Sequence, residues 1–422
     1  MRVRRSLKLW ANVVLFFLNA TSVSFAQIKT ESGTVRLLRA PSLQQCASDS
    51  AVLSWKTDLA VMSRIEYGLH QNFTHAAQSD TPATFHVVTL RNLASDRRYF
   101  YRVVADGHVL YESEFQTYPQ VGDKRYEHFS FWAMGDGGSG DATQMAVRDQ
   151  LQKLVHAGEV DFGLYLGDIV YEDGKEEDQD PKYFTPYQKI LDRQVCWPAL
   201  GNHDTHVENG EPYYRNRVLP VPDTLAAPFQ PERWYAFTFG DAVFIALDTR
   251  YPKYELQWRF LEAQLQRHRD KLWKFVFFHH PPYATPYTDR HNCKRASEML
   301  VRKHLAPLFE KYEVDMVFSG HNHSYQRSLL RKDYVPESKG VYYLVSGGAG
   351  HEVRAVALAD TTCHEPKLTQ AAVQSHAYHF VQVTIAGNRL ALRAIDMNGK
   401  VFDTFAYDKS ETALPARMET ER

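Results

Sequence analysis

Residues 162–171 read FGLYLGDIVY, a short apolar run followed by a glycine and two polar side chains, Asp168 and Tyr171. An apolar run of about four to eight residues that stops at a glycine is typical of a buried β-strand ending in a tight bend. Such a bend exposes the side chain that comes next. Four other clusters of metal-binding residue types also follow apolar runs: Gly135-Asp136-Gly137-Gly138, Gly201-Asn202-His203-Asp204, Val276-Phe277-Phe278-His279 and Gly320-His321-Asn322-His323.

Around these clusters the sequence alternates between expected strands and expected helices. Helix-spaced apolar residues occur in Ala142–His156, Tyr254–Arg269 and Ala296–Tyr312, where Pro307 can kink the last helix. This alternation predicts an α/β domain whose site is built from loops at the carboxyl ends of strands. The expected strands are Phe129–Met134, Phe162–Leu166, Val195–Leu200, Ala242–Leu247, Lys274–Phe278, Met316–Ser319 and Val341–Val345.

The segment before this domain has a different pattern. From Gly33 to Thr117, short β-rich runs are separated by turn residues at intervals typical of a small all-β sandwich. We therefore expect a β-sandwich over residues 33–118, an α/β catalytic domain over 124–407 and a polar tail over 408–422.

The first 26 residues have the features of a secretory signal peptide. They contain a basic start, a mostly apolar run from Leu9 to Leu18, and Ser24-Phe25-Ala26 as a cleavage site. An uncleaved signal anchor is the alternative. No later stretch is apolar enough to span a membrane, so we expect a secreted or periplasmic protein without stable membrane insertion after cleavage.

Charge and cysteine content narrow the range of partners. The formal net charge of −1 becomes −5 when the four basic residues of the signal peptide are removed. A mildly acidic chain without a basic stripe argues against a dedicated nucleic acid partner. The four cysteines can pair in three ways; we expect Cys196 to be a buried thiol and Cys293–Cys363 to be the pair, and none has zinc-finger spacing.

Taken together, the clusters supply two carboxylates, a phenol, an amide oxygen and several imidazoles. Such a set can hold two adjacent metal ions, which is the usual equipment for in-line displacement at phosphorus. The acidic run Glu172–Asp180 lies next to Tyr171. We expect it to be a solvated loop, with extra cation binding as the alternative.

The order GDxG, GDxxY, GNH(D/E), VxxH, GHxH resembles that of the purple acid phosphatases, a branch of the calcineurin-like metallophosphoesterases. The resemblance covers roughly Glu127 to Tyr407. It implies a β-sheet sandwich flanked by helices as the catalytic fold. The preceding β-rich segment resembles, on strand pattern alone, the fibronectin type III-like domain of larger family members.

The resemblance also implies a ligand set for two metal ions, with Asp168 bridging them. Fe(3+) is expected at the first position and a divalent ion (Fe, Zn or Mn) at the second, which agrees with phenolate-oxygen and imidazole preferences. The first ion is expected on Asp136, Asp168, Tyr171 and His323. The second ion is expected on Asp168, Asn202, His279 and His321.

Other residues are expected near the substrate. His203 is expected to bind a phosphoryl oxygen or protonate the leaving group, and Asp204 to orient His203. His291 is a candidate substrate-binding histidine. Successive strand residues point to opposite faces, so His280 is expected to be a buried or supporting histidine. His351 is expected to lie at the surface or beside the cleft.

The function implied is a secreted acid phosphatase that hydrolyses phosphate monoesters by attack of a metal-bound hydroxide. A phosphodiesterase or nucleotide hydrolase with the same metals is the alternative, because the ligand motifs do not separate the two. An idle binding protein is a third reading, but it predicts lost ligands and none is missing. The sequence leaves the oligomeric state open.

Overall fold

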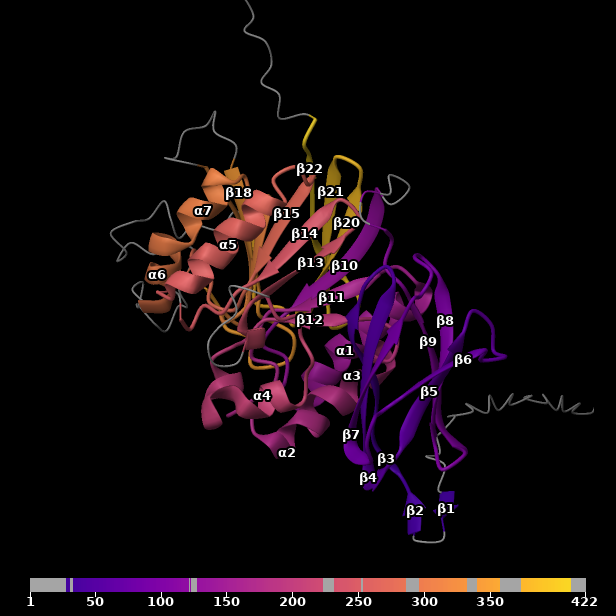
Figure 1. The fold of residues 1–422 in the computed structure, drawn as a ribbon. Coiled ribbons are helices and arrows are strands. Elements are labelled where there is room, and N and C mark those ends of the chain that lie inside the picture. The colour runs from indigo at the N-terminus through magenta and orange to yellow at the C-terminus, as the bar shows by residue number, and fades with distance from the viewer. Residues whose placement is uncertain are drawn as a thin grey trace, which may run out of the picture.

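The computed structural model describes residues 28–30, 33–120, 122, 127–222, 231–251, 253–285, 296–331, 340–356 and 373–410. The expected signal peptide, His291, Cys293 and Cys363 lie outside these residues. A β-sandwich and an α/β part with two stacked sheets lie side by side (Figure 1). The fold class expected from the sequence is therefore confirmed.

The N-terminal sandwich consists of a three-stranded sheet of order β3-β4-β7 and a four-stranded sheet of order β6-β5-β8-β9. All pairings are antiparallel. Alternate side chains such as Leu53, Trp55 and Tyr101 are fully buried between the sheets, as expected from the two-residue period of a strand. The strands, with a preceding hairpin, are β1 (Ile28–Thr30), β2 (Gly33–Val35), β3 (Leu37–Cys46), β4 (Ser50–Val61), β5 (Ser63–Gly68), β6 (His75–Gln78), β7 (Ala83–Arg91), β8 (Arg98–Ala105) and β9 (His108–Gln116).

The α/β part contains a six-stranded sheet of order β12-β11-β10-β20-β21-β22. Strands β10, β11 and β12 run parallel, whereas β20, β21 and β22 are antiparallel to their neighbours. The three C-terminal strands were not predicted from the sequence. The bounds are β10 (His128–Met134), β11 (Phe162–Tyr165), β12 (Cys196–Pro198), β20 (His379–Ala386), β21 (Arg389–Asp396) and β22 (Val401–Asp408).

A seven-stranded sheet of order β13-β14-β15-β16-β18-β17-β19 packs against the first one. Strands β14, β15, β16 and β18 are parallel. Their carboxyl ends therefore meet at one edge, where loops can build a site. The bounds are β13 (Tyr235–Phe239), β14 (Ala242–Ala246), β15 (Trp273–Phe277), β16 (Met316–Ser319), β17 (Tyr325–Arg331), β18 (Gly340–Ser346) and β19 (Val373–Ser375).

Phenylalanine side chains fill the space between the two sheets of the α/β part. The Phe131 ring of β10 lies 5.2 Å from Phe244 and 5.6 Å from Phe318, which belong to the other sheet. All three rings are fully buried. The apolar runs in the sequence are thus explained by strands that are covered on both faces.

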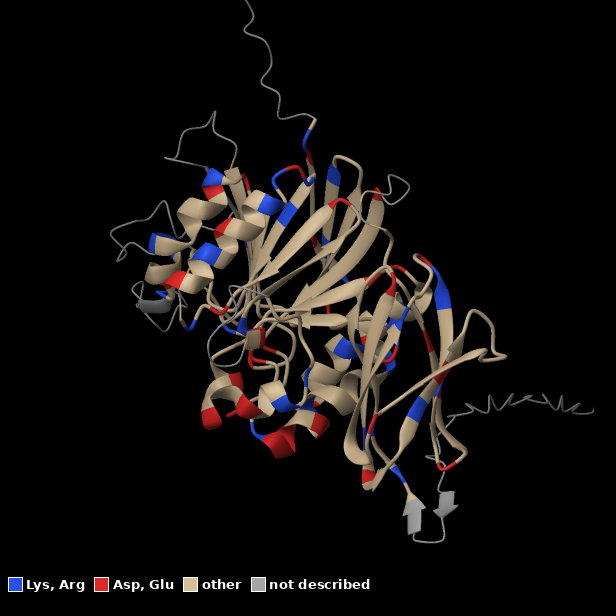
Figure 2. Ribbon diagram, viewed as in Figure 1, with Lys and Arg blue, Asp and Glu red and all other residues tan. Residues whose placement is uncertain are grey.

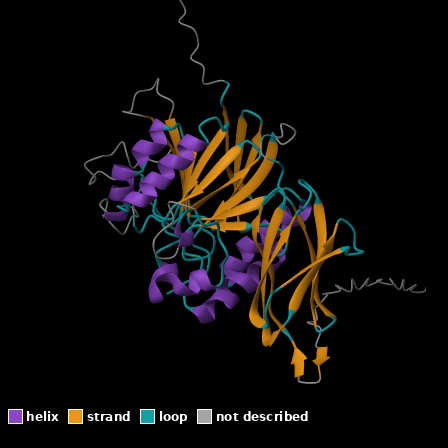
Figure 3. Ribbon diagram, in the orientation of Figure 1, coloured by secondary structure: helices purple, strands orange, loops and turns teal. Residues whose placement is uncertain are grey.

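Helices cover the outer faces of the stacked sheets. Helices α5, α6 and α7 lie beside the seven-stranded sheet, and α1 and α3 lie on the side nearer to the sandwich (Figures 1 and 3). The helices are α1 (Ala142–Ala157), α2 (Glu176–Gln179), α3 (Thr185–Leu191), α4 (Glu211–Arg215), α5 (Glu255–Arg267), α6 (Ala296–His304) and α7 (Ala306–Lys311). Shorter turns are η2 (Asp180–Phe184), η3 (His203–Thr205), η4 (Glu208–Gly210) and η5 (Pro231–Arg233).

Two helices show how local sequence sets their ends. Helix α1 begins after Asp141, whose carboxylate accepts from the backbone of Thr143 and Gln144, and it ends at Gly158 with φ of 70°. The helix expected over Ala296–Tyr312 is interrupted at Leu305, and Pro307 lies in the first turn of the second piece. None of the described helices is long and apolar enough to cross a bilayer.

The acidic run is more ordered than expected. Acidic residues gather on α2 and α4 (Figure 2). Two residues of the acidic run form ion pairs with basic residues of the sandwich. Lys56 lies 3.1 Å from Glu176, and Arg39 pairs with Asp180. The expectation of a purely solvated loop is therefore wrong for this end of the run.

The sandwich is also attached through a buried carboxylate after α3. Tyr111 and Ser113 of β9 donate to Asp192 Oδ2 at 2.9 and 3.0 Å, and Tyr101 donates to the Asp192 carbonyl at 2.9 Å. Asp192 is 1% exposed. Three side chains of the sandwich thus converge on one residue of the α/β part.

Candidate metal centre

The candidate ligands come from five loops at the carboxyl ends of β10, β11, β12, β15 and β16. Three of these residues have left-handed backbone conformations, with φ of 61° at Asp136, 50° at Asp168 and 67° at His321. Such conformations are strained for residues other than glycine and occur preferentially at functional sites. The strain indicates that the surrounding packing holds these side chains in place.

A first group of polar atoms surrounds the Tyr171 hydroxyl. It lies 3.1 Å from Asp136 Oδ1, 3.1 Å from Asp168 Oδ2 and 3.1 Å from His323 Nε2. His323 Nε2 is also 3.4 Å from Asp136 Oδ1. All four side chains are buried.

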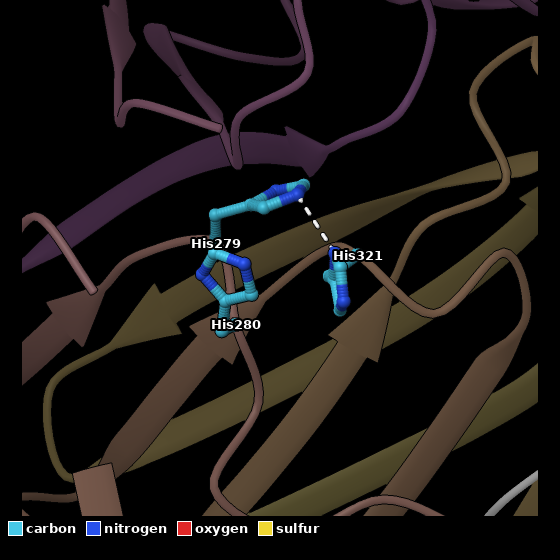
Figure 4. A group of neighbouring side chains, drawn as sticks. All are labelled: His279, His280 and His321. Atoms are coloured by element: carbon cyan, nitrogen blue, oxygen red, sulfur yellow. Dashed lines mark hydrogen bonds between the residues drawn. The ribbon is translucent and has the colours of Figure 1, made fainter. Parts of the chain in front are cut away.

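A second group surrounds the Nε2 atom of His279. This nitrogen lies 3.0 Å from Asp168 Oδ2, 3.1 Å from Asn202 Oδ1 and 3.2 Å from His321 Nδ1. Figure 4 shows the His279 and His321 rings, with the short separation dashed. The Asp168 Oδ2 atom therefore belongs to both groups.

These separations match the edges of a metal coordination polyhedron. Ligand atoms at about 2.0–2.2 Å from an ion, in tetrahedral or octahedral arrangement, are roughly 2.8–3.6 Å apart. Each group thus has the spacing of one coordination sphere, and the two spheres would share the Asp168 oxygen. The structure brings together all seven side chains that the sequence suggested as metal ligands.

The electrostatics of the groups favour bound cations. Asp136 and Asp168 are buried, and among the described residues no Lys or Arg pairs with either carboxylate. Burial opposes a charged His279, but the Asp168 and Asp136 carboxylates raise its pKa to about 9. Burial and the same carboxylates hold the pKa of Tyr171 well above its ordinary value. A proton on His279 therefore supplies positive charge that a cation would otherwise bring.

Backbone carbonyls fix the orientation of two of the imidazoles. His279 Nδ1 lies 2.8 Å from the Leu166 carbonyl, and His323 Nδ1 lies 2.8 Å from the Glu352 carbonyl. Each Nδ1 donates to its carbonyl, which leaves Nε2 directed at the group. These carbonyls could not be found from the sequence, because backbone acceptors carry no residue signal.

His203 lies beside the first group. Its backbone N–H donates to Asp168 Oδ1 at 2.8 Å, and its ring is 4.4 Å from the Tyr171 ring. Its Nδ1 is 2.5 Å from the Glu172 carbonyl, which leaves Nε2 available to a substrate.

The contacts of Asp204 differ from the expectation that it orients His203. Its carboxylate accepts from the backbone N–H groups of Ile169, Val170 and Gly201 at 2.8, 3.2 and 2.9 Å. Asp204 thus joins the loops after β11 and β12. The support for His203 comes from the Glu172 carbonyl instead.

His280 lies near the second group without being one of its expected members. One nitrogen from each of His279, His280 and His321 lies within 4.8 Å of the others (Figure 4). His280 Nδ1 is 3.0 Å from the Thr249 hydroxyl. His291, the candidate substrate-binding histidine, is outside the described residues.

Comparison with known proteins identifies the family. The model for calcineurin-like phosphoesterases matches residues 104–325, more than half of the chain, and the chain belongs to this family. The matched range contains every member of both groups. The chain therefore has a metallophosphoesterase domain, which hydrolyses phosphoric ester bonds.

In the alignments with individual relatives, about a quarter of the aligned residues are identical. Phosphoenolpyruvate phosphatase of Allium cepa is 26% identical over 341 residues, covering 72% of this chain and 67% of that protein. Purple acid phosphatase of Glycine max is 28% identical over 261 residues, covering 58% of this chain and 52% of that protein. The chain thus spans between half and about two thirds of these relatives.

A solved structure shares the fold. Purple acid phosphatase PPD1 from yellow lupin superposes with a TM-score of 0.73 at 18% identity, covering 90% of this chain and 76% of that one. At this identity the likeness concerns the fold alone.

Proposed function

We propose that this protein is a binuclear-metal phosphatase of the purple acid phosphatase type that hydrolyses phosphate monoesters. The observation that carries the proposal is the pair of ligand groups joined at Asp168 Oδ2, with every separation from Tyr171 and His279 between 3.0 and 3.2 Å. The phosphatase activity named for the Allium cepa and Glycine max relatives supports the same assignment.

Asp136, Asp168, Tyr171 and His323 would hold Fe(3+), because oxygen ligands with a phenolate suit a hard ion. Asp168, Asn202, His279 and His321 would hold a divalent Fe, Zn or Mn ion. Two such ions, when bound, would lower the pKa of water and neutralise charge on the phosphoryl oxygens.

The protein side chains near the ions would bind and orient the ester. His203 has its Nδ1 bound to the Glu172 carbonyl, so its Nε2 would contact a phosphoryl oxygen or give a proton to the leaving oxygen. Asp204 would act through the loop that carries His203, and His291 remains a prediction for substrate binding. The buried side chains of the first group would restrict the access of water to the reacting phosphorus.

The proposal extends to the remaining parts of the chain. Residues 33–118 would be a fibronectin type III-like domain, and 124–407 the catalytic domain. The basic and apolar start of the sequence supports a signal peptide over 1–26 and a secreted or periplasmic protein.

Metal analysis and a visible absorption spectrum of the purified protein test the proposal. We expect two metal ions per chain, at least one of them iron, and a phenolate-to-iron charge-transfer band. Asp168→Asn should lose both ions and turnover, whereas His376→Ala, which changes an exposed histidine, should lose neither. Rates on a phosphate monoester and on the matching diester decide the substrate class. An active but iron-free, colourless enzyme would contradict the purple acid phosphatase assignment.

A further inference from the structure

His351 contacts the first ligand group without belonging to it. Its imidazole lies 4.0 Å from the Tyr171 ring, at 31° between the planes, and 4.8 Å from the His323 ring. It therefore packs against two of the four side chains of that group.

The backbone of His351 is tied to the same group. Its N–H donates to the Asp136 carbonyl at 2.9 Å, and Ala349 N–H donates to the Gly135 carbonyl at 3.1 Å. A Cβ atom at Gly347 would lie 2.8 Å from Asp136 Oδ2. The glycine-rich turn after β18 thus approaches the Asp136 loop closely enough to place His351 over the ligands.

The polar contacts of the two imidazole nitrogens do not account for the position of the His351 ring. Nε2 lies 3.4 Å from the Glu172 carboxylate, which is 70% exposed. Nδ1 is buried and has no hydrogen-bond partner among the described residues. Glu172 also contacts His203 through its carbonyl, so one residue links His351 and His203, both of which pack against the Tyr171 ring.

We propose that His351 is a positioning residue that holds Tyr171 and His323 in ligand geometry through ring packing and its backbone bond to Asp136. This inference rests on the proposed function. Residues that orient metal ligands commonly change metal affinity or activity by about 10- to 100-fold when replaced. A histidine that only lined the wall would leave the metal properties unchanged.

The test compares His351→Ala with His351→Phe, which keeps an aromatic ring, and with His376→Ala as an exposed control. For His351→Ala we expect a shifted charge-transfer band, about tenfold weaker binding of the Tyr171-side ion and a lower kcat at similar KM. His351→Phe should restore most of the band and affinity. The rise in Tm between metal-stripped and metal-loaded protein gives a readout apart from activity, and it should shrink in His351→Ala alone.

The outcomes separate this inference from the proposed function. A wild-type protein without two metal ions would overturn both. A wild-type protein that holds both ions, with a His351→Ala variant of unchanged band, affinity and Tm rise, would overturn the role of His351 only. A His351→Phe variant as impaired as His351→Ala would overturn the ring-packing mechanism.

Discussion

At the residue scale, Asp168 is the residue that joins the two ligand groups of the candidate centre. Its Oδ2 atom faces both Tyr171 and His279, and its Oδ1 atom accepts from the His203 backbone. Burial opposes its charge, but the neighbouring His279 imidazole lowers the pKa of Asp168 below its ordinary value. One carboxylate thus sets the positions of both groups and of the adjacent histidine.

We expect His203→Ala to keep both metal ions and to lose most of the rate. Its side chain is not a member of either ligand group, and its free Nε2 atom is the part that would meet the substrate. Loss of a general acid or of a phosphoryl contact typically lowers the rate by about 100-fold or more. Metal content and kcat of the variant check this expectation. A near-wild-type rate would remove His203 from the reaction.

The residue types of the centre could be predicted from the sequence, but their contacts could only partly be predicted. The sequence pointed to Asp136, Asp168 and His321, because each follows an apolar run that ends in a glycine bend. The contacts of Asp204 could not be foreseen. A position in a turn does not tell whether a carboxylate meets a neighbouring ring or backbone N–H groups.

At the element scale, Asp204 fastens two loops together. Its two oxygens accept three backbone N–H groups from Ile169, Val170 and Gly201. The first two follow β11 and the third follows β12, so the bonds fix the spacing of the loops that carry Asp168 and Asn202.

We therefore expect Asp204→Ala to destabilise the protein and loosen the metal centre. Three buried N–H groups would lose their acceptor, at a cost of about 2–4 kcal/mol in the free energy of unfolding. Asp204→Asn keeps one acceptor oxygen, so its free energy of unfolding should lie between those of Asp204→Ala and wild type. Urea unfolding and metal titration measure the two effects. An Asp204→Ala protein as stable as wild type would show that the loops hold without these bonds.

The elements themselves were predicted unevenly, for physical reasons. The fully buried strands β11, β14 and β16 stand out as apolar runs. Strand β22 (Val401–Asp408) has partly exposed side chains on both faces, which gives a weak signal. Strand β20 pairs with β10, which lies far away in the sequence, and local periodicity does not report such a pairing.

At the scale of the whole molecule, His379 links the two stacked sheets. It lies at the start of β20, and its Nε2 is 3.0 Å from the Ser346 hydroxyl at the end of β18. Burial lowers the pKa of His379 from 6.5 to about 4. The unfolded chain therefore takes up this proton at higher pH than the folded protein does.

The consequence is a loss of stability in acid. The contribution of His379 is complete above about pH 6.5 and is lost as the pH falls toward about 4, by up to roughly 3 kcal/mol. His379→Gln, which does not titrate, should lose less unfolding free energy than wild type between pH 7 and pH 4.5. Urea unfolding at both pH values measures the difference. Equal losses in the two proteins would contradict a neutral, buried His379.

The attachment of the sandwich to the α/β part depends on Asp192. Burial raises the pKa of Asp192, and its oxygens accept from Tyr101, Tyr111 and Ser113. In Asp192→Ala the Tyr111 and Ser113 hydroxyls would lose their acceptor, which costs about 1–3 kcal/mol. In Asp192→Asn an amide oxygen remains, so that variant should stay closer to wild type.

Because the described contacts of Asp192 include no member of the metal centre, metal content should not change in either variant. The sandwich strand β9 should instead exchange its amide hydrogens faster in Asp192→Ala, since the docking that protects it is weakened. Hydrogen exchange of β8 and β9, together with the unfolding midpoint, measures this. Unchanged exchange with an unchanged midpoint would mean that other contacts, such as Lys56 with Glu176, hold the two parts together without Asp192.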